Sequence, residues 1–355
     1  MLKRSSNCRM HFKPIDVVCS MATKECAQEL ALFLTSLRAF HPTLPLVIGC
    51  SSELLKWIDG GQYDTQGRQG SFTDGSFWDF MKPFRSDPHI RWVPCLDPYG
   101  PMIERHAMER ERGVWYPSRH TDFMMEKANL MELAMATSNL SLRRSDSSAF
   151  NSAPDLILDG GEEDSPTVAF IDCDVSFLAP LPEIPRDAIV ALSPHRIHHL
   201  EERLFGVYNG GFVVATHPLV LYQWRKATQT SFYFDQASLQ TVAAANRTRL
   251  YELPPEHNYG YWRLFQNPSG DPTREVAKFS ISPDHSTMAP RYRSVRYDGK
   301  CLGSVHTHFF PQSPVSKEVL LFNRLLKGWI TECVRSEHGM KSNTKYQSAL
   351  YPLWQ

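Results

Sequence analysis

Short apolar runs alternate with amphipathic stretches through the first part of the chain. The runs at Ile15–Ser20 and Leu44–Gly49 are continuous rather than alternating, which is typical of strands covered on both faces. Between them, Glu25–Phe40 carries its apolar residues on one stripe, with Thr23 in the position of an N-cap, and this pattern predicts a helix. Strand, helix and strand in this order predict a βαβ unit with parallel strands.

The same kind of pattern continues to the end of the chain. We expect a third strand at Ile90–Pro94, a helix at Asp122–Thr137, a strand at Thr167–Ile171 and a late helix at Lys317–Val334. Polar, aperiodic stretches predict a loop at 60–75 and a flexible insertion at 141–164. We therefore predict one α/β domain over 13–334, built on a mixed, mostly parallel sheet with helices on both faces, and a C-terminal tail at 335–355.

Composition narrows the class of protein. Of the 355 residues, 38 are Lys or Arg and 38 are Asp or Glu, so the chain lacks the basic excess of a general nucleic-acid binder. No apolar run reaches the roughly 18 residues of a transmembrane segment. The eight cysteines form no CxxC motif, which favours reduced thiols and a cytoplasmic protein.

Two carboxylates directly follow a predicted buried strand. The apolar residues Val168–Ile171 lead into Asp172, Cys173 and Asp174. In an extended segment both carboxylates point the same way, and the carboxyl end of such a strand is where α/β sheets bind ligands. Like charges this close repel unless a cation joins them, and Mg²⁺ or Mn²⁺ prefers oxygen ligands. A surface turn with two solvated carboxylates is the alternative.

Two histidines and one lysine are further candidates. His306 and His308 alternate at the end of an apolar stretch, so both face one side of a strand and at least one is a candidate metal ligand. Lys127 lies on an apolar helical stripe, where a lysine either extends to solvent or meets an anion. A diphosphate or Asp174 is the partner we expect. Arg119 is a weaker second candidate.

Six segments, in this order, resemble those of GT-A nucleotide-sugar glycosyltransferases, most of all the retaining galactosyl- and glucosyltransferases related to glycogenin. They are Val168–Phe177, Leu192–Arg196, Tyr208–Ala215, Phe234–Leu239, His257–Trp262 and Ser304–Phe310. The resemblance implies a GT-A fold, an Mn²⁺ or Mg²⁺ ion and a nucleotide-diphospho-sugar donor, with a UDP-sugar favoured. The family's Gly and Lys-Pro after the late histidine are missing here, where Phe310 and Pro311 follow and Lys317 comes late.

The resemblance also implies roles for the metal and the nucleotide. Asp174 binds the metal directly, Asp172 contacts the ribose or the metal through water, and one of His306 and His308 completes the protein ligands. Other donor contacts come from Lys127, from Gly210 and Gly211, and from the loop after the first strand, where Ser20, Ala22 and Thr23 hold the base and ribose.

The remaining roles concern the sugar. Asn209 precedes two glycines that let a ligand approach the backbone, and its amide suits a sugar hydroxyl; a plain turn is the alternative. Asp235 faces sugar hydroxyls or merely caps a helix, and Gln236 lies near the anomeric carbon. The resemblance thus implies transfer of the sugar, with retention, to an unidentified acceptor. A nucleotidyltransferase or nucleotide-sugar hydrolase, and a non-catalytic nucleotide-sugar-binding protein, are the alternatives.

Overall fold

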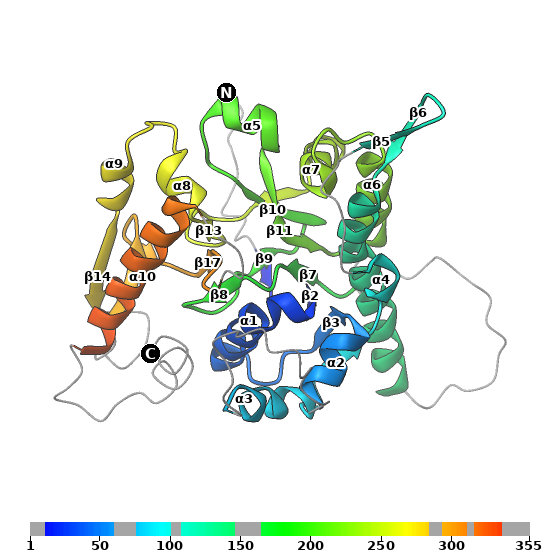
Figure 1. Ribbon diagram of the computed structural model, residues 1–355, viewed down its shortest axis with the longest axis horizontal. Coiled ribbons are helices and arrows are strands. Elements are labelled where there is room, and N and C mark those ends of the chain that lie inside the picture. The colour runs from blue at the N-terminus through cyan, green and yellow to red at the C-terminus, as the bar shows by residue number, and fades with distance from the viewer. Residues whose placement is uncertain are drawn as a thin grey trace, which may run out of the picture.

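A seven-stranded sheet forms the centre of the protein (Figure 1). The computed structural model describes residues 11–59, 76–100, 108–145, 165–283, 293–310 and 316–335. In spatial order the strands are β12 (Leu250–Glu252), β10 (Val190–Pro194), β11 (Tyr208–Ala215), β7 (Val168–Ile171), β2 (Val17–Ala22), β3 (Leu46–Cys50) and β4 (Ile90–Val93). Within this sheet β11 alone runs against the other six strands. The predicted mixed, mostly parallel sheet is confirmed.

Helices cover both faces of this sheet, as predicted (Figure 1). On one face lie α1 (Ala27–Phe40), α2 (Ser52–Ile58) and α3 (Ser76–Arg85), and on the other lie α4 (Arg119–Ser145), α6 (Pro218–Thr228) and α7 (Phe234–Ala245). In β2, Val18 packs toward α1 while Val17 and Cys19 pack toward α4. Alternate side chains therefore enter two different cores, which explains why the strand sequence is continuously apolar.

A third core joins the smaller sheets to the last helix. One sheet consists of β13 (Tyr259–Gly260), β17 (Ser304–His306) and β8 (Val175–Phe177), and another of β14 (Phe279–Pro283), β15 (Arg293–Tyr297) and β16 (Lys300–Cys301). They pack with α8 (Trp262–Phe265), α9 (Pro272–Val276) and α10 (Lys317–Arg335). Because β7 belongs to the central sheet and β8 to a small one, the turn between these strands lies where the two sheets meet.

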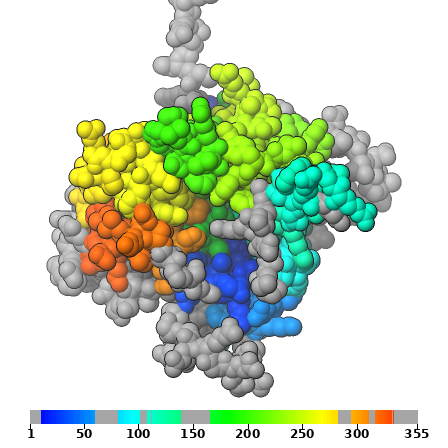
Figure 2. Space-filling view, turned by 45° about the horizontal axis from the view of Figure 1, so that its top comes forward, coloured from blue at the N-terminus to red at the C-terminus, as the bar shows by residue number. Residues whose placement is uncertain are grey.

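The other elements are short. They are β1 (Phe12–Lys13) paired with β9 (Ile184–Pro185), the hairpin of β5 (Met108–Glu111) and β6 (Val114–Pro117), α5 (His199–Phe205), and the 3₁₀ turns η1 (Lys24–Cys26) and η2 (Asp97–Tyr99). In the space-filling view, the blue N-terminal part and the green, yellow and orange later parts meet around the middle of the visible face (Figure 2). No helix in the described ranges is long and apolar enough to cross a membrane.

Several predicted boundaries need correction. The helix predicted at Asp122–Thr137 runs from Arg119 to Ser145, and so enters the stretch predicted as an insertion. The first strand extends to Ala22, so the predicted loop residues Ser20 and Ala22 lie inside β2. Residues 60–75, 146–164 and 336–355, which include the predicted loop, most of the predicted insertion and the tail, lie outside the described residues. The predicted domain limits stay predictions.

Candidate active site

The two predicted carboxylates are presented by a tight turn. β7 ends at Ile171 and β8 begins at Val175, and the Val175 amide donates to the carbonyl oxygen of Asp172 at 3.1 Å. The expectation of an extended segment was therefore wrong, because the chain must turn here to leave the central sheet. Cys173 packs into the core on the α1 side. The carboxylates of Asp172 and Asp174 nevertheless converge, through the turn rather than through strand alternation.

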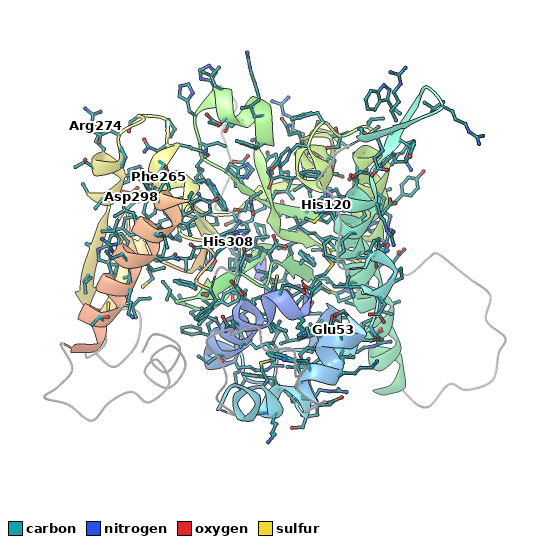
Figure 3. The ribbon with its side chains drawn as sticks, viewed as in Figure 1. Glu53, His120, Phe265, Arg274, Asp298 and His308 are labelled. Atoms are coloured by element: carbon teal, nitrogen blue, oxygen red, sulfur yellow. The ribbon has the colours of Figure 1, made fainter. Side chains whose placement is uncertain are left out.

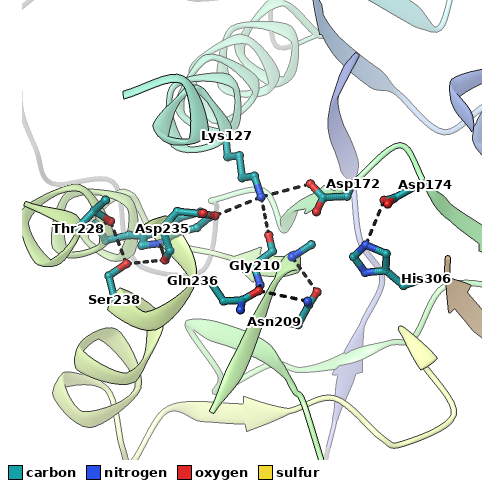
Figure 4. Close-up of polar contacts among 12 residues, drawn as sticks. Lys127, Asp172, Asp174, Asn209, Gly210, Thr228, Asp235, Gln236, Ser238 and His306 are labelled. Carbon is teal, nitrogen blue, oxygen red and sulfur yellow. Dashed lines mark hydrogen bonds and ion pairs between the residues drawn. The ribbon is translucent and has the colours of Figure 1, made fainter. Parts of the chain in front are cut away.

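Lys127 holds one of these carboxylates. Its Nζ lies 3.2 Å from Oδ1 of Asp172 and 3.1 Å from Oδ2 of Asp235, and it donates to the carbonyl oxygen of Gly210 at 3.1 Å (Figure 4). The lysine side chain is 1% exposed. Burial alone would lower its pKa, but Asp172 and Asp235 outweigh burial and raise it, so Lys127 stays charged. The expectation that Lys127 pairs with Asp174 was wrong, because α4 directs the lysine to Asp172 and Asp235 instead.

Asp235 is buried inside the first turn of α7. Tyr233 takes the N-cap position, so the alternative of Asp235 as a plain helix cap does not describe this helix. Burial raises the pKa of Asp235, and the charge of Lys127 opposes that shift. The main chain of the same residue also matters, since its carbonyl oxygen accepts from the Trp224 indole at 2.8 Å. Asp235 is thus held on both its main chain and its side chain.

The second carboxylate is held by the two histidines. Oδ1 of Asp174 lies 3.1 Å from Nε2 of His306, and Oδ2 lies 3.2 Å from Nδ1 of His308. The His306 side chain is 10% exposed and that of His308 is 51% exposed. Burial alone would raise the pKa of Asp174, but His306 and then His308 outweigh it and lower the pKa to about 2. Burial would likewise lower the pKa of His306, and Asp174 outweighs that effect and raises it.

The glycine pair of β11 makes room for both groups. A Cβ on Gly210 would lie 2.7 Å from Oδ2 of Asp235, and one on Gly211 would lie 2.6 Å from Oδ2 of Asp172 and 2.4 Å from Cε1 of His306. No side chain fits at either position without displacing its neighbours. The groups that lie against this backbone are side chains of the same chain. The predicted approach of a ligand to the two glycines stays a prediction.

The site fits a hard divalent cation. One ligand atom each from Asp172, Asp174 and His306 lie within 4.8 Å of one another, and two carboxylate oxygens with one imidazole nitrogen suit Mn²⁺ or Mg²⁺. This group contains His306 and leaves out the more exposed His308. The geometry thus favours His306 where the sequence left the choice between the two histidines open.

The amides of Asn209 and Gln236 are fixed by a hydrogen-bond network. Oε1 of Gln236 accepts from the Gly210 amide at 3.2 Å and from Nδ2 of Asn209 at 3.3 Å, and its Nε2 donates to the carbonyl oxygen of Phe205 at 2.8 Å. Oδ1 of Asn209 accepts from the Gly211 amide at 2.9 Å. Both side chains are therefore oriented by backbone groups before any ligand binds.

One cavity of about 200 Å³ gathers most of the predicted site. His120 from α4 and His308 from the segment after β17 both belong to it (Figure 3). Its lining comprises His120, Met124, Lys127, Asp172, Asp174, Asn209, Gly210, Gly211, Tyr233, Phe234, Asp235, Gln236, Tyr261, Trp262, His306 and His308. Within the described residues, the predicted Ser20, Ala22 and Thr23 are not part of this lining.

Sequence reasoning missed the aromatic part of the lining. Tyr233 and Phe234 belong to the aromatic run before Asp235, and Tyr261 and Trp262 end the His257–Trp262 segment. Sequence reasoning gave roles only to Asp235 and Gln236 beside the first stretch and to no residue of the second. Aromatic faces suit a sugar ring or a base, so the runs themselves were a usable signal.

A larger hollow of about 520 Å³ includes residues from the neighbouring stripe of α4. Its lining includes Arg119, Asp122, Glu126 and Arg225. Tyr99 donates to Glu126 at 2.7 Å, and the Arg119 guanidinium donates to the carbonyl oxygen of Pro98. Because neither Asp172, Asp174 nor His306 lines it, the hollow is separate from the site above, and Arg119 belongs to the hollow rather than to that site.

No family model and no curated protein match the sequence. A crystal structure of galactosyltransferase LgtC in complex with donor and acceptor sugar analogues is similar over 94% of this chain and 100% of that chain, with 12% identity and a TM-score of 0.39. The WbbM bifunctional glycosyltransferase covers 72% of this chain and 40% of that chain (13% identity, TM-score 0.37). The similarity to glycosyltransferase GlyE of Streptococcus pneumoniae TIGR4 covers 70% of this chain and 48% of that chain, with 9% identity and a TM-score of 0.34. All three of these proteins are glycosyltransferases.

Proposed function

We propose that this chain is a metal-dependent GT-A glycosyltransferase that moves a sugar from a nucleotide-diphospho-sugar, with a UDP-sugar favoured, to an acceptor with retention of configuration. The observation that carries the proposal is the convergence of Asp172, Asp174 and His306 in the same cavity as Asp235 and Gln236. The candidate metal site lies next to a set of fixed polar side chains. This arrangement suits a donor that has a diphosphate at one end and a sugar at the other.

The metal would be held by Asp174 and His306, with Asp172 as a further ligand or a water-mediated one. When bound, Mn²⁺ or Mg²⁺ would act as a Lewis acid that neutralises charge on the departing diphosphate. Asp172 also pairs with Lys127 at 3.2 Å, so it links the metal ligands to a permanent positive charge. That cation offsets part of the negative charge that Asp172 and Asp235 bring to the cavity, and so lowers the repulsion that a diphosphate would meet there.

The sugar would lie against the other side of the cavity. Asp235 is held in place by Lys127 and can accept hydrogen bonds from sugar hydroxyls. Asn209 lines the cavity, but both ends of its amide are already bonded, so it would act by holding Gln236 in place rather than by binding a hydroxyl itself. The carbonyl oxygen of Gln236 is fixed by two donors, so its partial negative charge is in place for the oxocarbenium-like charge that develops at the anomeric carbon. The leaving diphosphate can take the proton of the acceptor, so retention needs no separate basic side chain.

Two other classes use the same features. A nucleotidyltransferase or nucleotide-sugar hydrolase would need the same paired carboxylates, and a non-catalytic protein would bind the donor without turning it over. Product analysis of the donor with and without acceptors separates the three classes. A cytoplasmic location stays a prediction from the sequence.

The first experiment is a thermal-shift screen of nucleotide-sugars with Mn²⁺, followed by transfer assays. A donor at 100 times its Kd should stabilise the protein by about 2.7 kcal/mol. Asp174→Asn should lose this Mn²⁺-dependent shift and the transfer activity, whereas Asp298→Asn, in an exposed turn, should keep both. Full activity of Asp174→Asn, or of the wild type in excess chelator, would contradict metal dependence. Donor hydrolysis that no acceptor diverts would favour the hydrolase.

A further inference from the structure

Asn258 is a fully buried amide that connects the two sides of the cavity without lining it. Its Nδ2 donates to Oγ of Ser193 at 3.0 Å and to Oδ1 of Asn209 at 3.0 Å, and its Oδ1 lies 3.0 Å from Nδ1 of His306. Its own backbone amide donates to Oγ of Ser304 at 2.8 Å. Its φ of 51° is a left-handed conformation that asparagine tolerates better than most residues.

Backbone groups determine which way the two amides point. The Gly211 amide can only donate, and it lies 2.9 Å from Oδ1 of Asn209, so that atom must be the oxygen. Asn258 approaches the same oxygen and must therefore present its NH₂ group there. Its Oδ1 is then left to face His306. A carbonyl oxygen accepts only, so Nδ1 of His306 must carry a hydrogen.

His195, at the other end of this hydrogen-bond network, gives the same orientation for the amide of Asn209. Nδ1 of His195 lies 2.7 Å from the carbonyl oxygen of Gly206, which can only accept. The hydrogen of a neutral His195 is therefore on Nδ1, and its Nε2 accepts from Nδ2 of Asn209 at 3.3 Å. Burial lowers the pKa of His195 to about 4, which keeps the ring neutral near pH 7. Asn209 thus has its oxygen toward Gly211 and Asn258 and its NH₂ group toward His195.

We propose that Asn258 is a positioning residue that keeps a hydrogen on Nδ1 of His306, so that Nε2, which meets Asp174 in the metal-free protein, is the nitrogen that gives up its hydrogen and turns its lone pair to the metal, and that ties this histidine to Asn209. The inference rests on the proposed function, which supplies the metal. A neutral imidazole has one lone pair, so the opposite tautomer would present an N–H to the cation. Removing the partner that fixes the tautomer of a ligating histidine typically weakens metal binding by about 10- to 100-fold.

Two substitutions of Asn258 test whether it orients the His306 ring or only supports the fold. Asn258→Gly accepts the positive φ and removes the amide, whereas Asn258→Asp keeps an acceptor opposite Nδ1 of His306. Asn267→Gly is the control, since Asn267 is also buried but donates to the carbonyl oxygens of Leu264 and Asp271. The first readout is the His306 tautomer, measured by NMR above the pKa of the ring on histidine-labelled protein in which Asp174→Ala removes the competing acceptor at Nε2. The second is the dissociation constant for Mn²⁺ alone, measured by EPR with Asp174 intact.

With asparagine or aspartate at position 258 we expect the hydrogen on Nδ1 in the first measurement and tight Mn²⁺ binding in the second. In Asn258→Gly we expect mixed tautomers and a dissociation constant for Mn²⁺ raised about 10- to 100-fold, with Asn267→Gly unchanged in both. Unchanged tautomer and affinity in Asn258→Gly would overturn the inference, as would equal losses in the Gly and Asp variants. A wild type that binds no Mn²⁺ would overturn the metal dependence of the proposed function, and the tautomer alone would then decide the role of Asn258.

Discussion

The two sides of the cavity are built differently although one turn supplies a carboxylate to each. On the lysine side, Asp172 and Asp235 share the buried cation of Lys127. On the histidine side, Asp174 is held by two imidazoles, one of them half exposed. A buried lysine is a permanent part of the fold. Imidazoles paired with a carboxylate can give up a proton and become ligands. The comparison indicates a fixed framework beside an exchangeable set of metal ligands.

The number of partners per carboxylate explains why the two sides titrate differently. Burial pushes the pKa of Asp235 and of Asp174 in the same direction, upward. Asp174 has two imidazole partners to itself and its pKa falls to about 2, whereas Asp235 shares one lysine and its pKa is raised. The lysine side therefore has one positive charge for two carboxylates. It depends on Lys127 more strictly than the histidine side depends on either histidine.

Removing the shared cation should have the largest effect. We expect Lys127→Met to lower the free energy of unfolding by about 3–5 kcal/mol, because it leaves a buried carboxylate without a partner. Urea denaturation measures the loss, with Lys226→Met, an exposed lysine on α6, as the control. Adding Asp235→Asn to Lys127→Met should recover part of the loss. If the free energy of unfolding falls by less than about 1 kcal/mol, as for a surface ion pair, the lysine side does not depend on its cation as the comparison requires.

The sequence predicted the elements whose signal is local. Continuous apolar runs indicated the strands at Leu44–Gly49 and Thr167–Ile171, and the structure has them at Leu46–Cys50 and Val168–Ile171. Asp172 and Asp174 could be singled out because charges directly after an apolar run are unusual. Their convergence was predicted for the wrong reason, since strand alternation was assumed where the chain turns between two sheets.

Partners fixed by tertiary packing could not be predicted in the same way. The stripe on α4 showed that Lys127 needs an anion, but only the packing of α4 against α7 and β7 makes that anion Asp235 and Asp172. Asn258 lies in a segment that resembles the family's, but the sequence assigned it no role, because a neutral amide in a short segment is unremarkable until its four hydrogen bonds are seen. Sequence patterns report burial and charge, whereas the geometry of a network depends on contacts between distant segments.

A smaller effect should separate the sugar from the diphosphate. If the lysine side is a framework for the sugar, Gln236→Ala and Asp235→Asn should lower transfer by about 5- to 150-fold, the effect of losing a hydrogen bond worth about 1–3 kcal/mol. Calorimetric titration with UDP and Mn²⁺ should give nearly unchanged affinity. Gln240→Ala, also on α7 but outside the cavity lining, is the control. Equal weakening of UDP binding and of transfer would assign these residues to the phosphates or to the fold.

The effect most limited in its conditions, because it is confined to high pH, concerns Glu29, a buried glutamate in the first turn of α1 near the histidine side. Burial, reinforced by the charge of Asp174, raises its pKa from 4.5 to about 7. The folded protein therefore holds this proton more tightly than the unfolded chain, so its contribution to stability is present below pH 4.5 and is lost as pH rises through about 7.

Glu29→Gln should therefore have little effect at pH 4.5 and raise the free energy of unfolding by about 2–3 kcal/mol at pH 8, because each pKa unit is worth about 1.4 kcal/mol. Urea denaturation across this range, in chelator, measures the difference, and Glu53→Gln on the surface of α2 is the control. Mn²⁺ should reduce the gain, because a cation on Asp174 offsets the charge that disfavours ionised Glu29. A gain that is the same at every pH would mean that the amide packs better, and that the charge of Asp174 does not reach Glu29.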